Sequence, residues 1–181
     1  MELNRFTFQC VFFSRISLEK GADVVLEVAS RLPDVGFSFY GQVDKAFKSY
    51  FQTQCAALHN VSYKGVFDSV EEDPVMELAK YDLHLFPTRW PHEGIPGVLV
   101  ETKIAAVPSI VSDICYNAEI VRDGEEGVVL KECSADELAK AIDRLRKGSS
   151  LLQKLKRGAL KSSERYYIDR YIDAIVADLS R

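Results

Sequence analysis

Charged residues stand beside glycines in two short segments of this chain. The first segment, SRISLEKG, holds Arg15 and Lys20 and ends on Gly21. Apolar residues at helical spacing follow it directly, so both cations lie at or near the start of a helix. Positive charge is unfavourable there because the amino end of a helix is itself partly positive. A phosphate or diphosphate held by helix amides, with both cations as clamps, would remove that conflict; two solvated surface cations are the alternative.

The second segment, EGIPGVLVE, begins on Glu93 and ends on Glu101. Pro96 suits the first turn of a helix, and the amides of Gly97 and Val98 would then be free to hold an anion. Eight residues span at most about 12 Å along a helix, comparable to the separation of a sugar and a ribose joined through a diphosphate. The two carboxylates could bind hydroxyls at both ends of one ligand. The alternatives are compensation of the helix dipole by the first glutamate and an exposed helix charge for the second.

Other motifs that could carry chemistry are absent from the sequence. It has no Asp-x-Asp pair, so we predict that the protein needs neither a metal ion nor a cofactor. It has neither GxGxxG nor GxxxxGK[ST], which disfavours a simple dehydrogenase and a P-loop NTPase. His84 lies in an apolar pattern and is interpreted as structural. The carboxylates of Asp136, Asp143, Glu125 and Glu126 are interpreted as solvated surface charges.

The elements that must position these segments alternate between two apolar patterns. An almost continuously apolar run predicts a buried strand over residues 6–13. Further strand candidates are residues 35–40, 61–63, 83–86, 109–111 and 127–130. Helical spacing predicts helices near residues 24–32, 44–58, 73–81, 96–106, 118–122 and 135–147, the last capped by Ser134 and Glu137. A final pattern from 151 to about 179, with Tyr167, Tyr171 and Ile175, is expected to pack across the end of the sheet.

Repeated β-helix-β units force a mostly parallel sheet with helices on both faces. The predicted fold class is therefore α/β, a single Rossmann-like, doubly wound domain over residues 1–181 with C-terminal helices from about 149. The length of 181 residues suits one domain of this kind. Ligands bind such sheets beyond the carboxyl ends of the strands, where both charged segments fall.

Composition narrows the partners and the compartment. A net charge of −4 disfavours nucleic acid as a partner, because nucleic-acid binders gather a basic surface. The four cysteines are widely spaced, which predicts reduced and mostly buried thiols. The sequence shows no signal peptide and no apolar run of about 18 residues, so a cytoplasmic location is expected, with association at a membrane surface left open.

Six segments taken in order carry a family resemblance: SRISLEKG, VSYKGVF, DLHLFPT, EGIPGVLVE, VPSIVSD and AEIVRDGEEGVVL. Over about residues 8–145 the chain resembles the C-terminal, donor-binding domain of group 1, retaining glycosyltransferases of GT-B fold. The resemblance implies transfer of a sugar from a nucleoside-diphosphate sugar to an acceptor, with retention at the anomeric carbon.

The resemblance covers only the donor-binding half of such an enzyme. It implies that the N-terminal acceptor domain is a partner in cis or in trans, and that the isolated chain is inactive in transfer. A non-catalytic nucleotide-sugar-binding or partner subunit is the alternative from another class. A sugar-nucleotide epimerase of the same fold is a third possibility.

The resemblance also implies roles for individual residues. Arg15 and Lys20 match the basic pair that neutralises the donor diphosphate, with the lysine at the leaving phosphate. Glu93 matches the glutamate at the donor sugar, and Glu101 matches the one that holds the ribose. The remaining expected contacts are the phosphate- and sugar-cradling loop of Gly94, Ile95, Pro96, Gly97 and Val98, and the base contacts of Tyr63, Lys64 and Gly65.

Four positions depart from the family pattern. Ser14 stands where relatives usually carry Gly, Thr102 replaces Ala, and the Gly41-Gln42 turn lacks a second Gly. Ala106 replaces the usual Gly before Pro108. Relative to glycine, an alanine in a left-handed helix cap lowers stability by on the order of 1 kcal/mol. We therefore expect either a remodelled cap at Ala106 or a less constrained site.

Overall fold

A six-stranded parallel sheet forms the centre of the structure, a computed structural model that describes residues 6–172, 176 and 178. The strand order is β3-β2-β1-β4-β5-β6, and every pairing is parallel. The strands are β1 (Gln9–Phe13), β2 (Gly36–Tyr40), β3 (Val61–Gly65), β4 (Leu83–Phe86), β5 (Ser109–Ser112) and β6 (Gly127–Leu130). The order reverses between β1 and β4, and this reversal places a crevice at the carboxyl ends of those strands.

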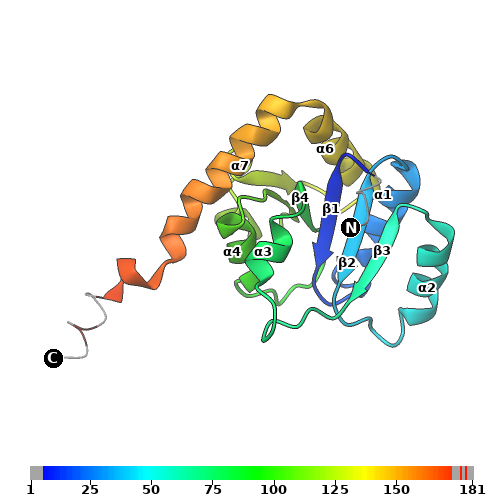
Figure 1. Ribbon diagram of the computed structural model, residues 1–181, viewed down its shortest axis with the longest axis horizontal. Coiled ribbons are helices and arrows are strands. Elements are labelled where there is room, and N and C mark those ends of the chain that lie inside the picture. Colours follow the sequence, from blue (N-terminus) through cyan, green and yellow to red (C-terminus); the bar gives the residue numbers. More distant parts are fainter. Residues whose placement is uncertain (1–5, 173–175, 177, 179–181) are drawn as a thin grey trace.

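Helices cover both faces of the sheet, as predicted (Figure 1). The helices are α1 (Ala22–Arg31), α2 (Lys48–Ala57), α3 (Pro74–Leu78), α4 (Gly97–Ile104), α5 (Asn117–Ile120), α6 (Ala135–Lys147) and α7 (Ser149–Ser163). In Figure 1, α1 and α2 lie to one side of the strands, and α3 and α4 lie to the other. The predicted Rossmann-like α/β fold is therefore confirmed.

Aromatic packing fixes the half of the sheet around β1 and β2. All five residues of β2 are buried, which a strand covered on both faces requires. Phe39 lies between Phe12 and Phe51, with ring centroids 5.3 Å and 5.4 Å away. Offset and edge contacts of this kind add to the energy of burial. The carboxyl ends of both strands are thus held rigidly beside the crevice.

Two predicted helices show how local hydrogen bonds set the helix ends. α6 spans the predicted residues, and the Ser134 hydroxyl caps it by accepting from the Glu137 amide at 3.3 Å. The Glu137 carboxylate completes the cap through the amide of Glu132 rather than that of the capping serine. α2 begins at Lys48 instead of residue 44, because the Asp44 carboxylate accepts from the Ala46 amide at 2.9 Å and forms a turn.

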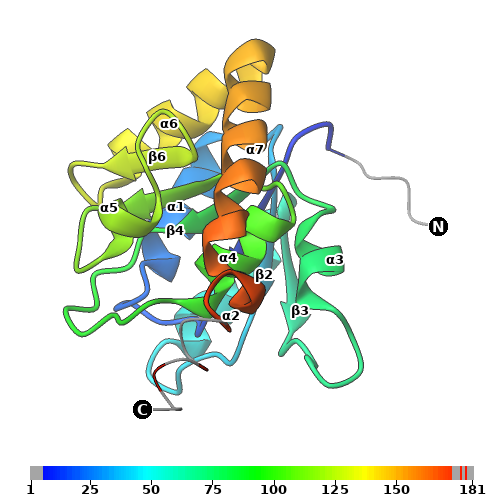
Figure 2. The ribbon, with the colours of Figure 1, turned by 90° about the vertical axis from the view of Figure 1, so that its left-hand side faces the viewer.

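The prediction for the C-terminal segment is wrong beyond α7. Leu152, Leu155 and Ala159 are buried as expected, and α7 packs along α4 (Figure 2). Tyr167 and Tyr171 are 45 % and 46 % exposed instead of packed against the sheet. After α7 the chain turns through two short 3-10 helices and projects from the domain (Figure 1). Ile175 lies outside the described residues.

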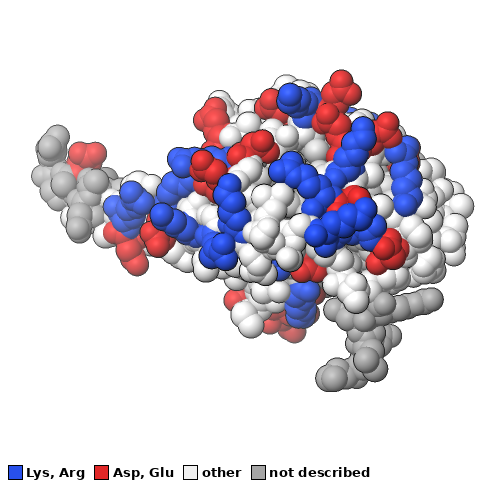
Figure 3. Space-filling view, turned by 90° about the horizontal axis from the view of Figure 1, so that it is seen from above, with Lys and Arg blue, Asp and Glu red and all other residues white. Residues whose placement is uncertain are grey.

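The edge of the sheet at which the strands begin lies beside α6, remote from the crevice. Figure 3 views the molecule from this side and shows Lys and Arg side chains with Asp and Glu between and beside them. Arg146 pairs here with Asp34 and Asp143, and Lys147 pairs with Asp143 at 2.6 Å. Exposed pairs of this kind contribute at most about 1 kcal/mol each.

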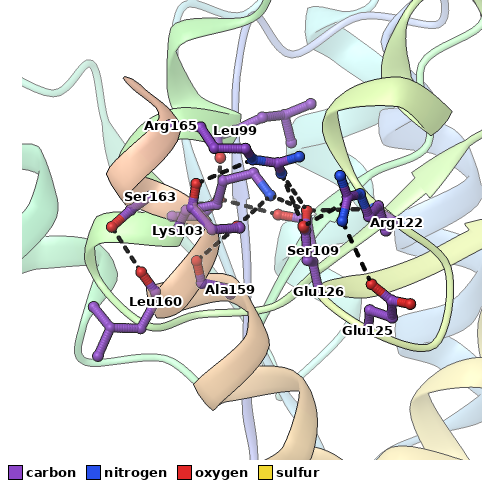
Figure 4. Close-up of polar contacts among 12 residues, drawn as sticks. Leu99, Lys103, Ser109, Arg122, Glu125, Glu126, Ala159, Leu160, Ser163 and Arg165 are labelled. Carbon is purple, nitrogen blue, oxygen red and sulfur yellow. Dashed lines mark hydrogen bonds and ion pairs between the residues drawn. The ribbon is translucent and has the colours of Figure 1, made fainter. Parts of the chain in front are cut away.

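A buried ion cluster joins α4 to the end of α7, and it corrects the prediction for Glu126 (Figure 4). Glu126 is only 5 % exposed rather than solvated. Its carboxylate accepts from Lys103 Nζ at 2.5 Å and from Arg165 Nη2 at 2.8 Å and 3.1 Å. Lys103 also donates to the Ser162 hydroxyl at 3.0 Å. Burial lowers the pKa of Lys103, so the charge of this ammonium depends on the carboxylate beside it.

Thr102 departs from the family pattern and builds a buried hydrogen-bond chain. Its hydroxyl bonds the Leu99 carbonyl and the Ser109 hydroxyl, both at 3.1 Å, and Ser109 bonds Nδ1 of His84 at 3.1 Å. Burial lowers the pKa of His84 to about 3, so its imidazole is neutral at physiological pH. The interpretation of this histidine as structural agrees with its position under α4.

The four cysteines are all free thiols. Only Cys10 is buried, Cys55 and Cys133 are half-buried, and Cys115 is exposed, so the expectation of mostly buried thiols is wrong. Within the described part of the chain, none of the helices has both the length and the apolar character needed to cross a membrane.

Ala106 forms the left-handed cap of α4, a conformation that glycine favours, and its φ is 57°. Its amide donates to the Lys103 carbonyl, and the Val107 amide donates to that of Thr102, as in a Schellman motif. We expect Ala106→Gly to raise the free energy of unfolding by about 1 kcal/mol, and the melting temperature by about 2–4 °C, because the side chain is strained there. Thermal and urea unfolding measure the effect.

The matched control is Ala105→Gly, one residue earlier, where φ is −72°. At that position no backbone strain is relieved, and glycine only adds conformational freedom to the unfolded chain. The free energy of unfolding is therefore expected to fall by roughly 0.5–1 kcal/mol. Equal shifts in both variants would contradict the argument from the left-handed cap.

Candidate functional site

Gly21 brings the start of α1 against the end of β4. It has a φ of 74°, and a Cβ in its place would lie 2.0 Å from the carbonyl oxygen of Pro87. Only glycine accommodates both the conformation and this approach. The loop carrying Lys20 is thereby held beside the loop carrying Glu93.

Lys20 and Glu93, which are 73 residues apart, form an ion pair in the crevice. Nζ of the lysine lies 2.5 Å from Oε2 of the glutamate, and each side chain is 12 % exposed. The ammonium also lies 5.7 Å from the ring centroid of Phe86. The alternative of a solvated surface cation is therefore wrong for Lys20. Arg15, in contrast, is exposed and pairs with Glu19 at 3.1 Å.

Thr88 is a further residue of this site that the sequence reasoning missed. Its side chain is buried, and its hydroxyl lies 3.1 Å from Oε2 of Glu93. The second oxygen of that carboxylate, Oε1, has no partner among the described residues. A hydroxyl residue two positions after a buried strand is the signal that could have indicated this role.

The loop before α4 presents backbone N–H groups that bind nothing within the described part of the chain. Pro96 is the capping residue, with φ −69° and ψ 120°, and α4 begins at Gly97 rather than at the proline. The amides of Gly94, Ile95, Gly97 and Val98 donate to none of the described residues. A Cβ at either glycine would meet nothing within 4 Å. Free donors at a helix start with open space beside them can hold an anion.

Glu101 lies half-buried on α4 without an ion pair or a hydrogen bond to its carboxylate from any residue that the structure describes. Burial raises its pKa, and the nearby charge of Asp73 raises it further. An exposed carboxylate on a helix would not have its pKa raised by burial. The alternative that Glu101 is simply an exposed helix charge is therefore wrong. A half-buried carboxylate without donors is costly unless a ligand supplies them.

Tyr63 and Lys64 are exposed at the carboxyl end of β3. The hydroxyl of Tyr63 donates to the Gly41 carbonyl at 3.1 Å, and the Gly41 amide donates to the Gly65 carbonyl at 2.8 Å. Gly65 has a φ of 87°. Beside this strand end is a pocket of about 340 Å³, lined by Gln42, Val43, Lys48, Phe51, Gln52, Tyr63 and Val66.

The predicted site residues thus fall on the loops after β1 and β4, on α4 and at the carboxyl end of β3. Lys20 and Glu93 form an ion pair, whereas no hydrogen bond or ion pair within the described residues joins Arg15, Glu101 or Tyr63 to them. No cluster of three or more His, Cys, Asp or Glu suited to a metal ion occurs in the described part of the chain. Independence of metal stays a prediction.

Solved structures share this fold with the chain. HepE from Anabaena, in complex with UDP and glucose, matches 96 % of the chain and 48 % of its own length, with a TM-score of 0.81 and 22 % identity. The C-terminal domain of LpcC, a group 1 family glycosyl transferase from Francisella tularensis, matches 90 % of the chain and 88 % of its own length, with a TM-score of 0.77 and 20 % identity. At these identities the likeness establishes the fold.

The sequence itself establishes the family. Residues 5–162 match the model of the group 1 glycosyl transferases, so the chain belongs to that family. An exopolysaccharide phosphotransferase from Streptomyces coelicolor is 34 % identical over 111 residues, which cover 58 % of this chain and 12 % of that protein. The chain therefore spans about half of the HepE structure and about an eighth of this curated relative.

Proposed function

We propose that the chain is the donor-binding domain of a retaining glycosyltransferase that uses a nucleoside-diphosphate sugar. One observation carries the proposal: helix amides and the Glu101 carboxylate, which have no partner among the described residues, lie on the loop and helix that follow β4, where the strand order reverses, and the largely buried Lys20 lies beside that loop. Together they offer groups complementary to a diphosphate and to the ribose attached to it. The complex of HepE with UDP and glucose supports this class of donor.

The diphosphate fits the positive side of the crevice. The amides of Gly94, Ile95, Gly97 and Val98 can donate to its oxygens, and Lys20 and Arg15 can neutralise its charge. Negative charge grows on the leaving phosphate as the bond to the sugar breaks. Donors fixed in a site with little water stabilise that charge without rearranging, which is how this chain would accelerate the reaction.

The two glutamates would hold the two sugars of the donor. Oε1 of Glu93 is free to accept from a hydroxyl of the transferred sugar, and the carboxylate of Glu101 can accept from the ribose hydroxyls. The base would lie at the end of β3, near Tyr63, Lys64 and Gly65. We propose that neither a metal ion nor another cofactor takes part, because cationic side chains and backbone amides stabilise the negative charge of the diphosphate in place of a metal ion.

The acceptor would bind to a second domain, either in the same protein or as a separate chain. The chain spans 48 % of the HepE structure, which supports a second domain beside it. A non-catalytic nucleotide-sugar-binding subunit would use the same crevice. Assay of the intact gene product with donor and candidate acceptors distinguishes the two, because only the enzyme makes a glycoside. An epimerase would instead convert the donor alone.

We expect the purified chain to bind UDP or GDP and the matching nucleotide sugar, but to transfer no sugar, since the acceptor would bind to the proposed second domain. Isothermal titration calorimetry measures the binding, and EDTA should leave the affinity unchanged. Failure to bind either diphosphate would overturn the proposed function. A large loss of affinity on chelation, restored by Mg²⁺ or Mn²⁺, would overturn its metal-free form.

A further inference from the structure

We propose that Thr88 is a positioning residue of the donor site, whose hydroxyl holds Glu93 in place when Lys20 leaves that carboxylate to bind the diphosphate. The proposal rests on the proposed function, because it concerns what donor binding does to the ion pair between Lys20 and Glu93. It assigns a role to a residue outside the two charged segments.

The hydroxyl of Thr88 has one proton to give, and its surroundings decide where that proton points. Its oxygen accepts from the amide of Trp90 at 3.2 Å. The remaining acceptors in reach are Oε2 of Glu93 at 3.1 Å and the carbonyl of Glu19 at 3.5 Å. The carboxylate is both nearer and charged, so the hydroxyl donates to Glu93.

The carboxylate of Glu93 receives both of its hydrogen bonds on one oxygen. Lys20 and Thr88 share Oε2, whereas Oε1 has no partner in the described residues. When Lys20 moves to the diphosphate, Thr88 therefore supplies the one bond that remains from the protein. Without it, a side chain that is only 12 % exposed would carry an uncompensated charge.

Thr88 is itself anchored independently of the ligand. Its backbone carbonyl accepts from the hydroxyl of Ser112, on β5, at 2.5 Å. The next amide, that of Arg89, donates to the carbonyl of Glu19 at 2.7 Å in the loop that carries Lys20. The hydroxyl is thus fixed between two loops, and it can hold Glu93 in the same position before and after Lys20 changes partner.

The test is Thr88→Val, which removes the hydroxyl and keeps the side-chain size. Calorimetry with UDP, or with GDP if the wild-type chain prefers it, should show roughly tenfold weaker binding, because the exchange leaves Glu93 without a donor. Thr88→Ser restores the hydroxyl and should bind within about twofold of wild type. Should the valine variant fail to fold, Thr88→Ala takes its place.

A double-mutant cycle separates this role from general support of the fold. In a Glu93→Gln background the side chain carries no charge that Thr88 must compensate. Adding Thr88→Val there should weaken diphosphate binding by less than about twofold. Thr102→Val removes another buried hydroxyl, which lies on α4 and bonds Ser109, and should leave the diphosphate affinity unchanged.

The outcomes bear on different claims. If the wild-type chain binds neither diphosphate, the proposed function fails. If it binds and Thr88→Val matches wild type, or costs the same tenfold in both backgrounds, the role of Thr88 is overturned while the donor site stands.

Discussion

Replacing Glu126 with alanine is expected to lower the free energy of unfolding by about 3–5 kcal/mol, the range typical of breaking a buried ion pair from one side. The carboxylate lies between Lys103 and Arg165, with N–O distances of 2.5 Å and 2.8 Å. Lys103 is 2 % exposed and, among the described residues, would keep only Ser162 as a hydrogen-bond partner. For a chain of this size, the melting temperature should fall on the order of 10 °C.

Glu125 supplies the control for this prediction. It precedes Glu126, its side chain is 64 % exposed, and its only ion pair is with Arg122 at 3.8 Å in the described residues. Glu125→Ala should change stability by less than about 0.5 kcal/mol. Adding Lys103→Met to the Glu126→Ala variant should recover part of the loss, because the buried charge is gone. Similar effects of the two alanine variants in urea unfolding would contradict the assignment of a buried cluster.

Glu101→Gln is expected to stabilise the empty protein at neutral pH and to weaken diphosphate binding by roughly 10- to 150-fold. The loss corresponds to charged hydrogen bonds worth about 1.5–3 kcal/mol. The gain follows because burial, helped by the charge of Asp73, raises the pKa of Glu101 in the folded state. The ionised carboxylate is therefore less favourable in the folded chain than in the unfolded chain, and glutamine removes that penalty.

The sign of the pH dependence follows from the raised pKa of Glu101. Stability of the wild-type chain falls as the pH rises from the unfolded pKa of this carboxyl through its folded pKa, and the penalty persists above both. The gain in melting temperature for Glu101→Gln should thus be present at pH 7 and vanish below the unfolded pKa, about 4.3. Ribose hydroxyls that donate to the carboxylate lower its pKa. Diphosphate binding should therefore release protons at pH values between the pKa of Glu101 in the complex and its pKa in the free folded protein.

Differential scanning fluorimetry across pH and calorimetry with UDP or GDP test both halves of the Glu101 prediction. Glu71→Gln, an exposed carboxyl of the loop before α3, is the control and should change neither measurement. A destabilised apo protein would contradict the burial penalty at Glu101, and unchanged binding would mean that Glu101 is not the ribose ligand.

The fold could be predicted from the sequence because local patterns and the sheet agree. The β2 and β4 segments are mostly apolar and buried throughout, and α6 carries both a cap and an apolar stripe, so their positions are close to those expected. The start of α2 could not be predicted, because the turn at Asp44 satisfies the backbone as well as a helix would. Tyr167 and Tyr171 continue a helical pattern in the sequence, yet the described structure offers them no surface to pack against.

The site was predictable as a set of loops but not as a set of contacts. Parallel strands bring their carboxyl ends together, so the segments of Lys20 and Glu93 had to lie near each other. Their direct pairing depends on how closely Gly21 approaches Pro87, a distance that spacing along the chain does not specify. Glu126 was misjudged for a related reason: its burial comes from Lys103 and Arg165, which are remote from it in sequence.

The buried ion cluster has a consequence for the entropy of ligand binding. Lys103 stands in the last turn of α4 and is held there by Glu126, so the body of the helix is already ordered in the empty protein. Only the few loop residues that precede Gly97 then need to become ordered when a ligand binds. Because few backbone torsions must be frozen, most of the interaction energy gained at the helix start is retained as affinity.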